Sequence, residues 1–490
     1  MLLSIEHIAR TCGATYLVEP ADPSALVNGI SWDSRTMTSG QAYLALPGER
    51  VDGHDFVLAS LQAGAIAALV MHELPADVLD CAREFGAAIL LVDDTAQAYT
   101  AVARMWRTML PAKVIGITGS SGKTTTKNLV RDVLSSVFRT TATQANQNNE
   151  LGVPRTLLAA STDDEAVIVE MGMRGLGQLE ELCEFVHPDM GLITNVGTCH
   201  MELLGTQENI ARAKAELFDA LPEGGIAFVN ALDGHVVEQW QRLKLDERGV
   251  RTVFYAGDGP WTYVDELAIT KKGLPFVWAD NTSFDADGRP SFTMCADGFG
   301  KGLQKAECTL EMRGRHNVSN ACAAAAVGIA MGLPLRLCAQ VLSQSVPDAG
   351  RSRVVRATCG ACVVDDAYNA NPDSMEASLS TFAVMNTDGR RIAVLGDMAE
   401  LGPYAEEGHA RIGAFAANCG LDMLYYVGEY AQTVIEAAQA AGMDGSRMMV
   451  LPDAQAVLAE LARQLRSDDI VLVKASNFLG FKSIVEGLVE

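Results

Sequence analysis

One short segment combines glycines, a lysine and threonines at the spacing of a phosphate-binding loop. The segment follows the apolar run VIGIT and consists of Gly119, Ser120, Ser121, Gly122, Lys123, Thr124 and Thr125. Glycines allow backbone N–H groups to approach phosphate oxygens closely, and the start of the following helix adds a positive partial charge. Lys123 is then placed to reach the outer phosphates, and Thr124 to ligate Mg²⁺. The segment therefore predicts a nucleotide site.

This loop is a variant of the usual pattern. The usual spacing places a glycine at position 117, and this chain has Ile117 there. A chance glycine-rich turn is the alternative. Because an apolar strand pattern, the lysine, the threonine and a long helical pattern occur in the right order, we favour the phosphate loop.

Three further residues have the right types for metal binding. Glu170 ends the apolar run AVIVE, and an acid at a strand tip beside a phosphate loop is where a Mg²⁺ ligand would lie. A surface acid explains Glu170 equally well. His200 follows the run ITNVGTC, and by itself it indicates a structural histidine. Lys214 borders the apolar face of a helical pattern, which by spacing alone predicts an exposed lysine.

Two polar clusters adjoin predicted elements of the second half. In GRHNVSNACAAAAVGIA, His316, Asn317 and Asn320 lie at the start of an alanine-rich helical pattern. An asparagine N-cap explains one of them and not the cluster. The segment DDAYNANPDSM (365–375) follows the apolar run ACVV. It therefore lies at the carboxyl end of a strand, where α/β folds bind their ligands.

The elements that must position these residues follow an α/β pattern. Buried-strand candidates at 166–172, 190–197 and 226–231 alternate with helical stretches, which indicates a parallel sheet. Residues 245–310 have short alternating segments and many turn residues, which predicts a β-rich insertion. Strand runs at 391–398, 423–428, 448–452 and 469–476 predict a separate doubly wound domain. We expect three domains, with bounds at 1–108, 109–350 and 351–490.

Charge and composition exclude several classes of protein. The 490 residues include 38 Lys and Arg against 61 Asp and Glu, for a net charge of −23, so we expect no nucleic-acid partner. Hydrophobic residues make up 49% of the chain, which excludes a mainly disordered protein. No apolar run approaches the ~20 residues that span a bilayer, so we expect no membrane insertion. The N-terminal segment MLLSIEHIARTCG has no signal-peptide pattern.

The cysteines favour a reducing compartment. There are eleven, an odd number scattered through a long chain, which is typical of a cytoplasmic protein rather than a disulfide framework. The close pair Cys359 and Cys362 lacks a second pair or a nearby histidine. We therefore expect two buried free thiols there and no zinc site.

Together these segments resemble the Mur ligase family of peptidoglycan synthesis. The resemblance covers nearly the whole chain. The matching segments are DSRTMTSGQAYLALPGERVDGHDF, TGSSGKTTTK, NQNNELGVPRTLL, VEMGMRG, GRHNVSNA, DDAYNANPDSM and GDMAELG. It implies a three-domain α/β architecture with a central P-loop ATPase domain containing a parallel sheet and a Rossmann-like C-terminal domain. NNELGVP, DDAYNANP and GDMAELG are most similar to the member that adds a D-alanyl-D-alanine dipeptide.

The resemblance also implies roles for individual residues. Lys123 and Thr124 would bind ATP phosphates and Mg²⁺, with Glu170 and His200 at metal positions. Lys214 matches a lysine that relatives carry as a carbamate near a second Mg²⁺. The remaining implied contacts are Asn317 near adenine, Arg351 at the γ-phosphate, Asp366 at ribose, and Ser34, Arg35, Gly48, Asp52, His54, Asn149, Tyr368 and Asn369 at substrate. The chain departs from the family at Asn477, where an arginine is usual.

The resemblance thus implies an ATP- and Mg²⁺-dependent ligase. It would join D-alanyl-D-alanine to UDP-N-acetylmuramoyl-tripeptide through an acyl phosphate, in the cytoplasm and as a monomer. Two alternatives stay open. One is another amino-acid ligase of the same family, such as the one that adds the third peptide residue. The other is a P-loop regulatory ATPase that hydrolyses ATP without an acceptor.

Overall fold

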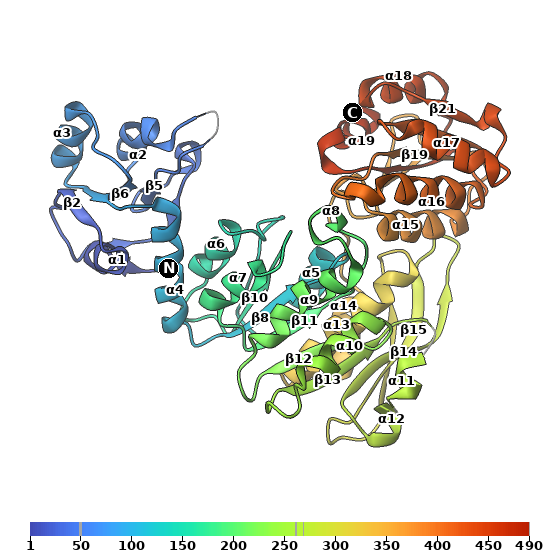
Figure 1. The fold of residues 1–490 in the computed structure, drawn as a ribbon, viewed down its shortest axis with the longest axis horizontal. Coiled ribbons are helices and arrows are strands. Elements are labelled where there is room, and N and C mark those ends of the chain that lie inside the picture. Colours follow the sequence, from blue (N-terminus) through green and yellow to red (C-terminus); the bar gives the residue numbers. More distant parts are fainter. Residues whose placement is uncertain (49–50, 260–261, 268, 490) are drawn as a thin grey trace. The chain divides into compact units, whose positions relative to one another are not determined.

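The computed structural model describes residues 1–48, 51–259, 262–267 and 269–489. They form two compact units, both with an α/β pattern (Figure 1). The first unit comprises Met1–Gly116, Phe138–Met171 and Glu180–Asp189. The second comprises Ile117–Val137, Gly172–Leu179 and Met190–Glu490.

The first unit contains a five-stranded sheet in the order β2-β7-β6-β5-β4. Strands β4 to β7 run parallel, β2 is antiparallel to β7, and β1 and β3 form a separate antiparallel pair. The elements are β1 (Leu3–Ser4), α1 (Ile5–Cys12), β2 (Thr15–Val18), β3 (Leu26–Val27), β4 (Ile30–Ser31), η1 (Ser34–Thr36), β5 (Ala42–Leu44), η2 (Gly53–Phe56), α2 (Val57–Gln62), β6 (Ala67–Val70), α3 (Ala76–Phe85), β7 (Ala88–Leu91) and α4 (Thr95–Met109).

Strands β8, β9 and β10 complete the first unit. They are neighbours in the order β8-β10-β9, and β9 and β10 run parallel. The elements are β8 (Lys113–Thr118), β9 (Thr140–Ala142), α6 (Gly152–Ala159), β10 (Ala166–Glu170) and α7 (Gln178–Val186), and the ends of β8 and α7 extend into the second unit. All five residues of β10 are buried, as the apolar run AVIVE predicts for a central strand.

The second unit begins with the phosphate-loop helix and continues the parallel pattern. Strands β11 to β14 run parallel, and β14, β15 and β16 run antiparallel. The elements are α5 (Lys123–Ser135), β11 (Met190–Ile193), α8 (Met201–Leu204), α9 (Gln207–Asp219), β12 (Ile226–Asn230), α10 (Gly234–Leu243), β13 (Arg251–Ala256), α11 (Thr262–Glu266), α12 (Ile269–Lys272), β14 (Phe276–Phe284), β15 (Pro290–Asp297), β16 (Gln304–Thr309), α13 (Arg315–Ala330) and α14 (Leu335–Leu342). The segment 245–310 is β-rich as predicted, and its strands extend the sheet at one edge.

A second sheet in this unit is doubly wound. Its order is β17-β18-β22-β19-β20-β21, with β17 antiparallel at one edge and the other strands parallel. The elements are β17 (Arg353–Arg356), β18 (Cys362–Asp365), α15 (Pro372–Val384), β19 (Arg391–Gly396), η3 (Gly402–Tyr404), α16 (Ala405–Ala417), β20 (Met423–Val427), α17 (Ala431–Ala440), η4 (Gly445–Arg447), β21 (Met448–Val450), α18 (Ala454–Gln464), β22 (Ile470–Lys474), η5 (Asn477–Leu479) and α19 (Lys482–Val489). The predicted βαβα repetition is therefore confirmed.

The doubly wound sheet has a core on each face. In β19, Ala393 and Leu395 pack with α15, α16 and α17, whereas Ile392 and Val394 pack with α18 and α19. Figure 1 shows these two groups of helices on opposite sides of β19. The alternation follows from the two-residue period of a strand, and it explains why its central strands are apolar throughout.

Residues 351–490 expressed alone should therefore fold cooperatively, because both of these cores lie within that range. The fragment should not hydrolyse ATP, since the loop at 119–125 is absent. Thermal unfolding followed by circular dichroism, with a phosphate-release assay on the same sample, measures both. A broad, non-cooperative melt would place the domain boundary elsewhere.

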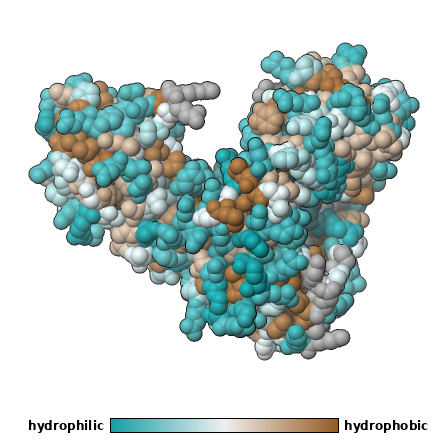
Figure 2. Space-filling view, viewed as in Figure 1, coloured by the Kyte–Doolittle hydropathy of each residue, from teal (hydrophilic) through white to brown (hydrophobic). Residues whose placement is uncertain are grey.

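The helices, the surface and the cysteines bear on three of the predictions from sequence. No helix in the described part of the chain has both the length and the apolarity needed to cross a membrane. On the face in view, Figure 2 shows small separate hydrophobic groups among hydrophilic residues. All eleven cysteines are free. The prediction of buried thiols is wrong for the close pair, because Cys359 is exposed in the turn between β17 and β18 and Cys362 is half-buried.

Candidate active site

The phosphate-loop segment folds as strand, loop and helix in the predicted order. Gly122 adopts a left-handed conformation at the N-cap of α5. Gly119 also has a positive φ, and a Cβ there would overlap the Thr194 hydroxyl. Both positions therefore require glycine, which lets the backbone make the tight turn into α5. The Lys123 ammonium lies over the loop and donates to the Gly119 carbonyl at 2.6 Å.

A second loop, which follows β11, braces the phosphate loop. The Asn195 side chain accepts a hydrogen bond from the Ser121 N–H at 2.9 Å, and the Asn195 carbonyl accepts one from the Ser120 N–H at 3.0 Å. The Gly197 N–H donates to the Ser120 hydroxyl at 2.8 Å. The carboxyl end of β11 thus determines the position of both serines.

His200 lies at the end of this bracing loop, in a left-handed conformation with φ 64°. Its Nδ1 lies 2.6 Å from a carboxylate oxygen of Glu400. Burial lowers the pKa of His200, and the hydrogen bond with Glu400 opposes that shift. The sequence alone indicated a structural histidine, and it did not indicate the partner, which is 200 residues away in the chain.

Lys214 is buried, and the prediction of an exposed lysine from helical spacing is wrong. It lies on α9 and is 1% exposed. Burial is the main cause that lowers the pKa of Lys214 to about 7, and the positive charge of Lys123 adds to the effect. A neutral amine is therefore accessible near neutral pH. Helical spacing did not predict the burial because Lys214 borders the apolar face of α9. For a residue at such a border, tertiary packing decides whether the side chain is buried or exposed.

Two further candidate residues, Glu170 and Asn149, lie in the first unit. Glu170 ends β10 and is buried, and its carboxylate accepts a hydrogen bond from the Asn148 amide at 2.8 Å. Asn149, which follows Asn148, accepts a hydrogen bond from the N–H of Gly152, the first residue of α6, at 2.9 Å. The NNELGVP segment is thus tied to the acidic end of β10.

Arg351 lies next to the phosphate loop. Its guanidinium donates to the Thr124 hydroxyl at 3.0 Å and lies 3.8 Å from the centre of the Tyr368 ring. Asn317 is buried, and its amide donates to the Arg313 carbonyl at 2.7 Å. The structure therefore brings Arg351 and Tyr368 to Thr124, while Asn317 is held within the start of α13.

Asp366 is buried among donors, which the sequence did not indicate. The Lys474 ammonium donates to its carboxylate at 2.7 Å and to the Asn369 carbonyl at 3.1 Å. The Ser352 N–H donates to the other carboxylate oxygen at 3.0 Å. Lys474 ends the buried strand β22. A charged residue at the end of the apolar run IVLVK is the one feature of the sequence that could have indicated a buried partner for Asp366. Asn477, where the family has arginine, is exposed at the start of η5.

The N-terminal candidates Ser34, Arg35, Gly48, Asp52 and His54 all belong to the first unit. Ser34 and Arg35 form η1, and the exposed Arg35 pairs with Asp33 at 2.8 Å. A Cβ on Gly48 would lie 2.7 Å from the Val51 carbonyl oxygen, so the close approach of the chain requires glycine there. Residues 49–50 lie outside the described range.

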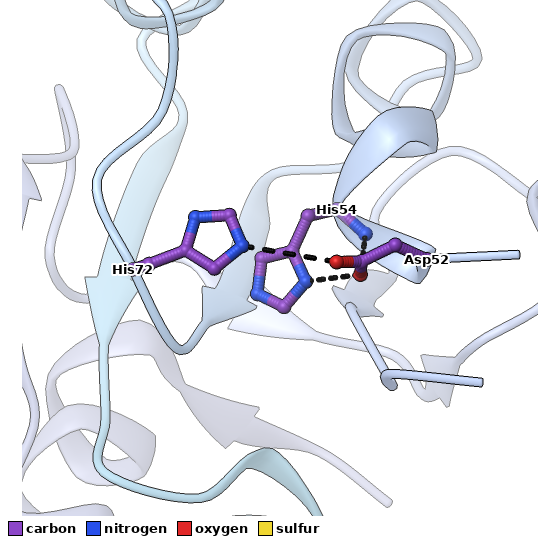
Figure 3. Close-up of side chains that lie close together, drawn as sticks. All are labelled: Asp52, His54 and His72. Atoms are coloured by element: carbon purple, nitrogen blue, oxygen red, sulfur yellow. Dashed lines mark hydrogen bonds and ion pairs between the residues drawn. The ribbon is translucent and has the colours of Figure 1, made fainter. Parts of the chain in front are cut away.

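Asp52, His54 and His72 form a compact cluster (Figure 3). Their possible ligand atoms lie within 4.8 Å of one another, as a metal site would need. However, His54 Nε2 accepts the Met71 N–H at 2.9 Å, so Nδ1 carries the proton and donates to Asp52 at 2.6 Å. Neither ring nitrogen has a lone pair left for a metal. The cluster therefore fastens the loop to the end of β6.

Comparison with known proteins supports the resemblance along the whole chain. Residues 26–107 match the Mur ligase family catalytic domain, residues 117–328 the Mur ligase middle domain, and residues 350–477 the Mur ligase glutamate ligase domain. A UDP-N-acetylmuramoyl-tripeptide–D-alanyl-D-alanine ligase from Synechocystis is 37% identical over 464 residues, which cover 94% of this chain and 92% of that protein.

Solved structures show the same architecture. The crystal structure of MurF from Acinetobacter baumannii superposes with a TM-score of 0.83 at 27% identity, covering 100% of this chain and 99% of that one. MurF ligase from Thermotoga maritima in complex with ADP gives a TM-score of 0.73 at 24% identity, covering 94% and 97%. The predicted three-domain α/β architecture is confirmed by these matches. The chain belongs to the Mur ligase family.

Proposed function

We propose that this chain is the ligase that joins D-alanyl-D-alanine to UDP-N-acetylmuramoyl-tripeptide with hydrolysis of ATP, a step in making peptidoglycan precursors. The observation that carries the proposal is identity of 30–37% over nearly the full length to ligases with this activity, including those of Synechocystis and Bacillus subtilis. The phosphate loop, with Lys123 and the Arg351–Thr124 contact beside it, supplies a matching chemical apparatus.

The chemistry requires activation of a carboxylate. The tripeptide carboxylate accepts the γ-phosphoryl group of ATP to give an acyl phosphate and ADP, and the dipeptide amine then displaces phosphate to form the amide. Both steps concentrate negative charge. Lys123 and Arg351 carry the opposite charge and would stabilise it. Water must be kept from the acyl phosphate, which explains why a ligase of this kind closes its domains on the substrates.

The family resemblance would assign Mg²⁺ to Thr124, Glu170, His200 and Lys214. Hydroxyl and carboxylate oxygens are the ligands that this ion prefers, and Thr124 and Glu170 provide them. His200 and Lys214 complete the proposed set. Lys214 is suited to become a carbamate, because its amine is buried and its pKa is about 7. When bound, Mg²⁺ would neutralise phosphate charge.

The remaining contacts in the proposal follow the family. Asn317 and Asp366 would contact adenine and ribose, with Gly119, Ser120, Ser121, Gly122 and Thr125 around the phosphates. The UDP-sugar would be held by Ser34, Arg35, Gly48, Asp52 and His54, and the peptide substrates by Asn149, Tyr368 and Asn369. We also propose domain bounds at 108/109 and 350/351, a monomer, and action in the cytoplasm.

Phosphate release with UDP-linked tripeptide tests the activity. Turnover with D-alanyl-D-alanine, and none with single amino acids, is the expected result. Acceptors ending in diaminopimelate and in lysine, assayed side by side, identify the third residue. Turnover with a single amino acid and a UDP-linked dipeptide would instead indicate the tripeptide-forming ligase. Phosphate release without any acceptor would indicate a regulatory ATPase.

A further inference from the structure

The N-terminus of α15 contacts Ser121 of the phosphate loop and the loop that braces Ser120. Asn371 is the N-cap of this helix, and its side-chain oxygen accepts the Ser374 N–H at 2.8 Å. The same amide donates from its nitrogen to the Ser121 hydroxyl at 3.1 Å. One side chain therefore both starts the helix and contacts the phosphate loop, 250 residues earlier in the chain.

Asp373, in the first turn of the helix, makes the second contact. Its carboxylate accepts the Thr198 N–H at 3.0 Å and the Thr198 hydroxyl at 3.3 Å. On its other side, the carboxylate lies 3.4 Å from the Arg411 guanidinium. Thr198 follows Gly197, whose N–H donates to the Ser120 hydroxyl. Asp373 thus acts on Ser120 through the bracing loop.

The approach is so close that position 197 must be glycine. A Cβ built there would overlap the Asp373 carboxylate, while it would lie 3.4 Å from the Ser120 Cβ, an ordinary contact. Gly197 does not have a positive φ. The need for glycine is therefore steric and comes from Asp373.

In these contacts the hydroxyls of Ser120 and Ser121 both act as hydrogen-bond acceptors. A serine hydroxyl has one proton to donate and lone pairs that accept. Ser120 accepts from Gly197, and Ser121 accepts from Asn371. Each hydroxyl thus has an accepting site filled and its proton left to donate. A phosphate offers only acceptors, so hydroxyls held as donors are already arranged for it.

We propose that Asn371 and Asp373 are positioning residues for the phosphate loop: by docking on it, the start of α15 orients Ser120 and Ser121 to donate to the phosphates of the nucleotide. The inference rests on the proposed function for the nature of the ligand and of the second substrate. It adds the end of the segment DDAYNANPDSM, beyond Asp366, to the residues that act on nucleotide binding.

A double-mutant cycle on Gly197 and Asp373 tests this inference. Gly197→Ala should weaken ADP binding by about tenfold, because the new methyl group forces the helix and the loop apart. In the Asp373→Ala background the same change should cost less than about threefold, because the carboxylate it would strike is gone. Equal losses in the two backgrounds, or affinities within about twofold of wild type throughout, would overturn the proposal.

Calorimetric titration with ADP alone measures these affinities without any acceptor. If the wild-type protein showed no ligation activity, the proposed function would be wrong, but the ADP affinities of the double-mutant cycle would still test the positioning role. Glu376→Gln is the matched control, because Glu376 lies on the same helix and pairs with the same Arg411 at 2.7 Å. It should leave ADP affinity unchanged. In ligation assays, Asp373→Ala should raise KM for ATP with KM for D-alanyl-D-alanine unchanged, whereas a general loss of structure would change both and lower the melting temperature.

Discussion

Lys123→Ala is expected to lower ligation by at least about 100-fold, since removing one preorganised donor from transition-state charge costs two to three orders of magnitude. The Lys123 ammonium lies 2.6 Å from the Gly119 carbonyl, so it is held against the loop proposed to bind the phosphates. The substitution removes this one positive charge and leaves every other charged side chain in place. Phosphate release at saturating substrates measures the effect.

Binding of the UDP-tripeptide to this variant should be largely intact. The residues proposed to hold the UDP-sugar belong to the first compact unit, and Lys123 belongs to the second. Calorimetric titration with the UDP-tripeptide measures this directly. Lys113→Ala is the control, because Lys113 lies in the preceding strand, is 57% exposed and pairs with Asp189 at 2.9 Å. If Lys123→Ala also lost UDP-tripeptide binding, the separation of the two sites would be wrong.

The local motifs were predictable because their structure depends on neighbours in the chain. An apolar run followed by Gly119 and Lys123 specifies strand, loop and helix within a dozen residues. The doubly wound sheet was predictable in the same way, because each strand and helix has its own apolar pattern. The strand, loop and helix around 119–125 and the buried strand that ends at Glu170 were therefore predicted from the residues themselves.

The missed features depend on distant contacts. Asn371 and Asp373 meet residues 250 and 175 positions away, and nothing in their local pattern shows which surface they will contact. Lys474 reaches Asp366 across 108 positions for the same reason. The burial of Lys214 also follows from the packing of α9 within the unit. Periodicity indicates which side of a helix is apolar, and it does not indicate how far the burial extends.

Lys214→Ala is expected to be nearly inactive, although an ordinary surface lysine would be dispensable. Carbamate formation joins the neutral amine to CO₂, with a new N–C bond and release of one proton. A lysine of ordinary pKa has about one neutral amine in a thousand at pH 7.5. Burial lowers the pKa of Lys214 to about 7, so at that pH most of its amine is neutral. Wild-type activity should therefore fall as the pH drops below about 7, where the amine is protonated.

The carbamate can be separated from a purely structural role by chemical rescue. A short carboxylic acid at high concentration should partly restore Lys214→Ala, because it supplies the missing anion in the space left by the side chain. Lys214→Arg should respond less, because its permanent cation occupies that space. Arg212→Ala, an exposed position on the same helix, should retain full activity without any additive. Mass spectrometry after trapping the carbamate by methylation should show the adduct on wild type alone. Near wild-type turnover of Lys214→Ala at saturating Mg²⁺ would mean that the buried amine serves only the packing of α9.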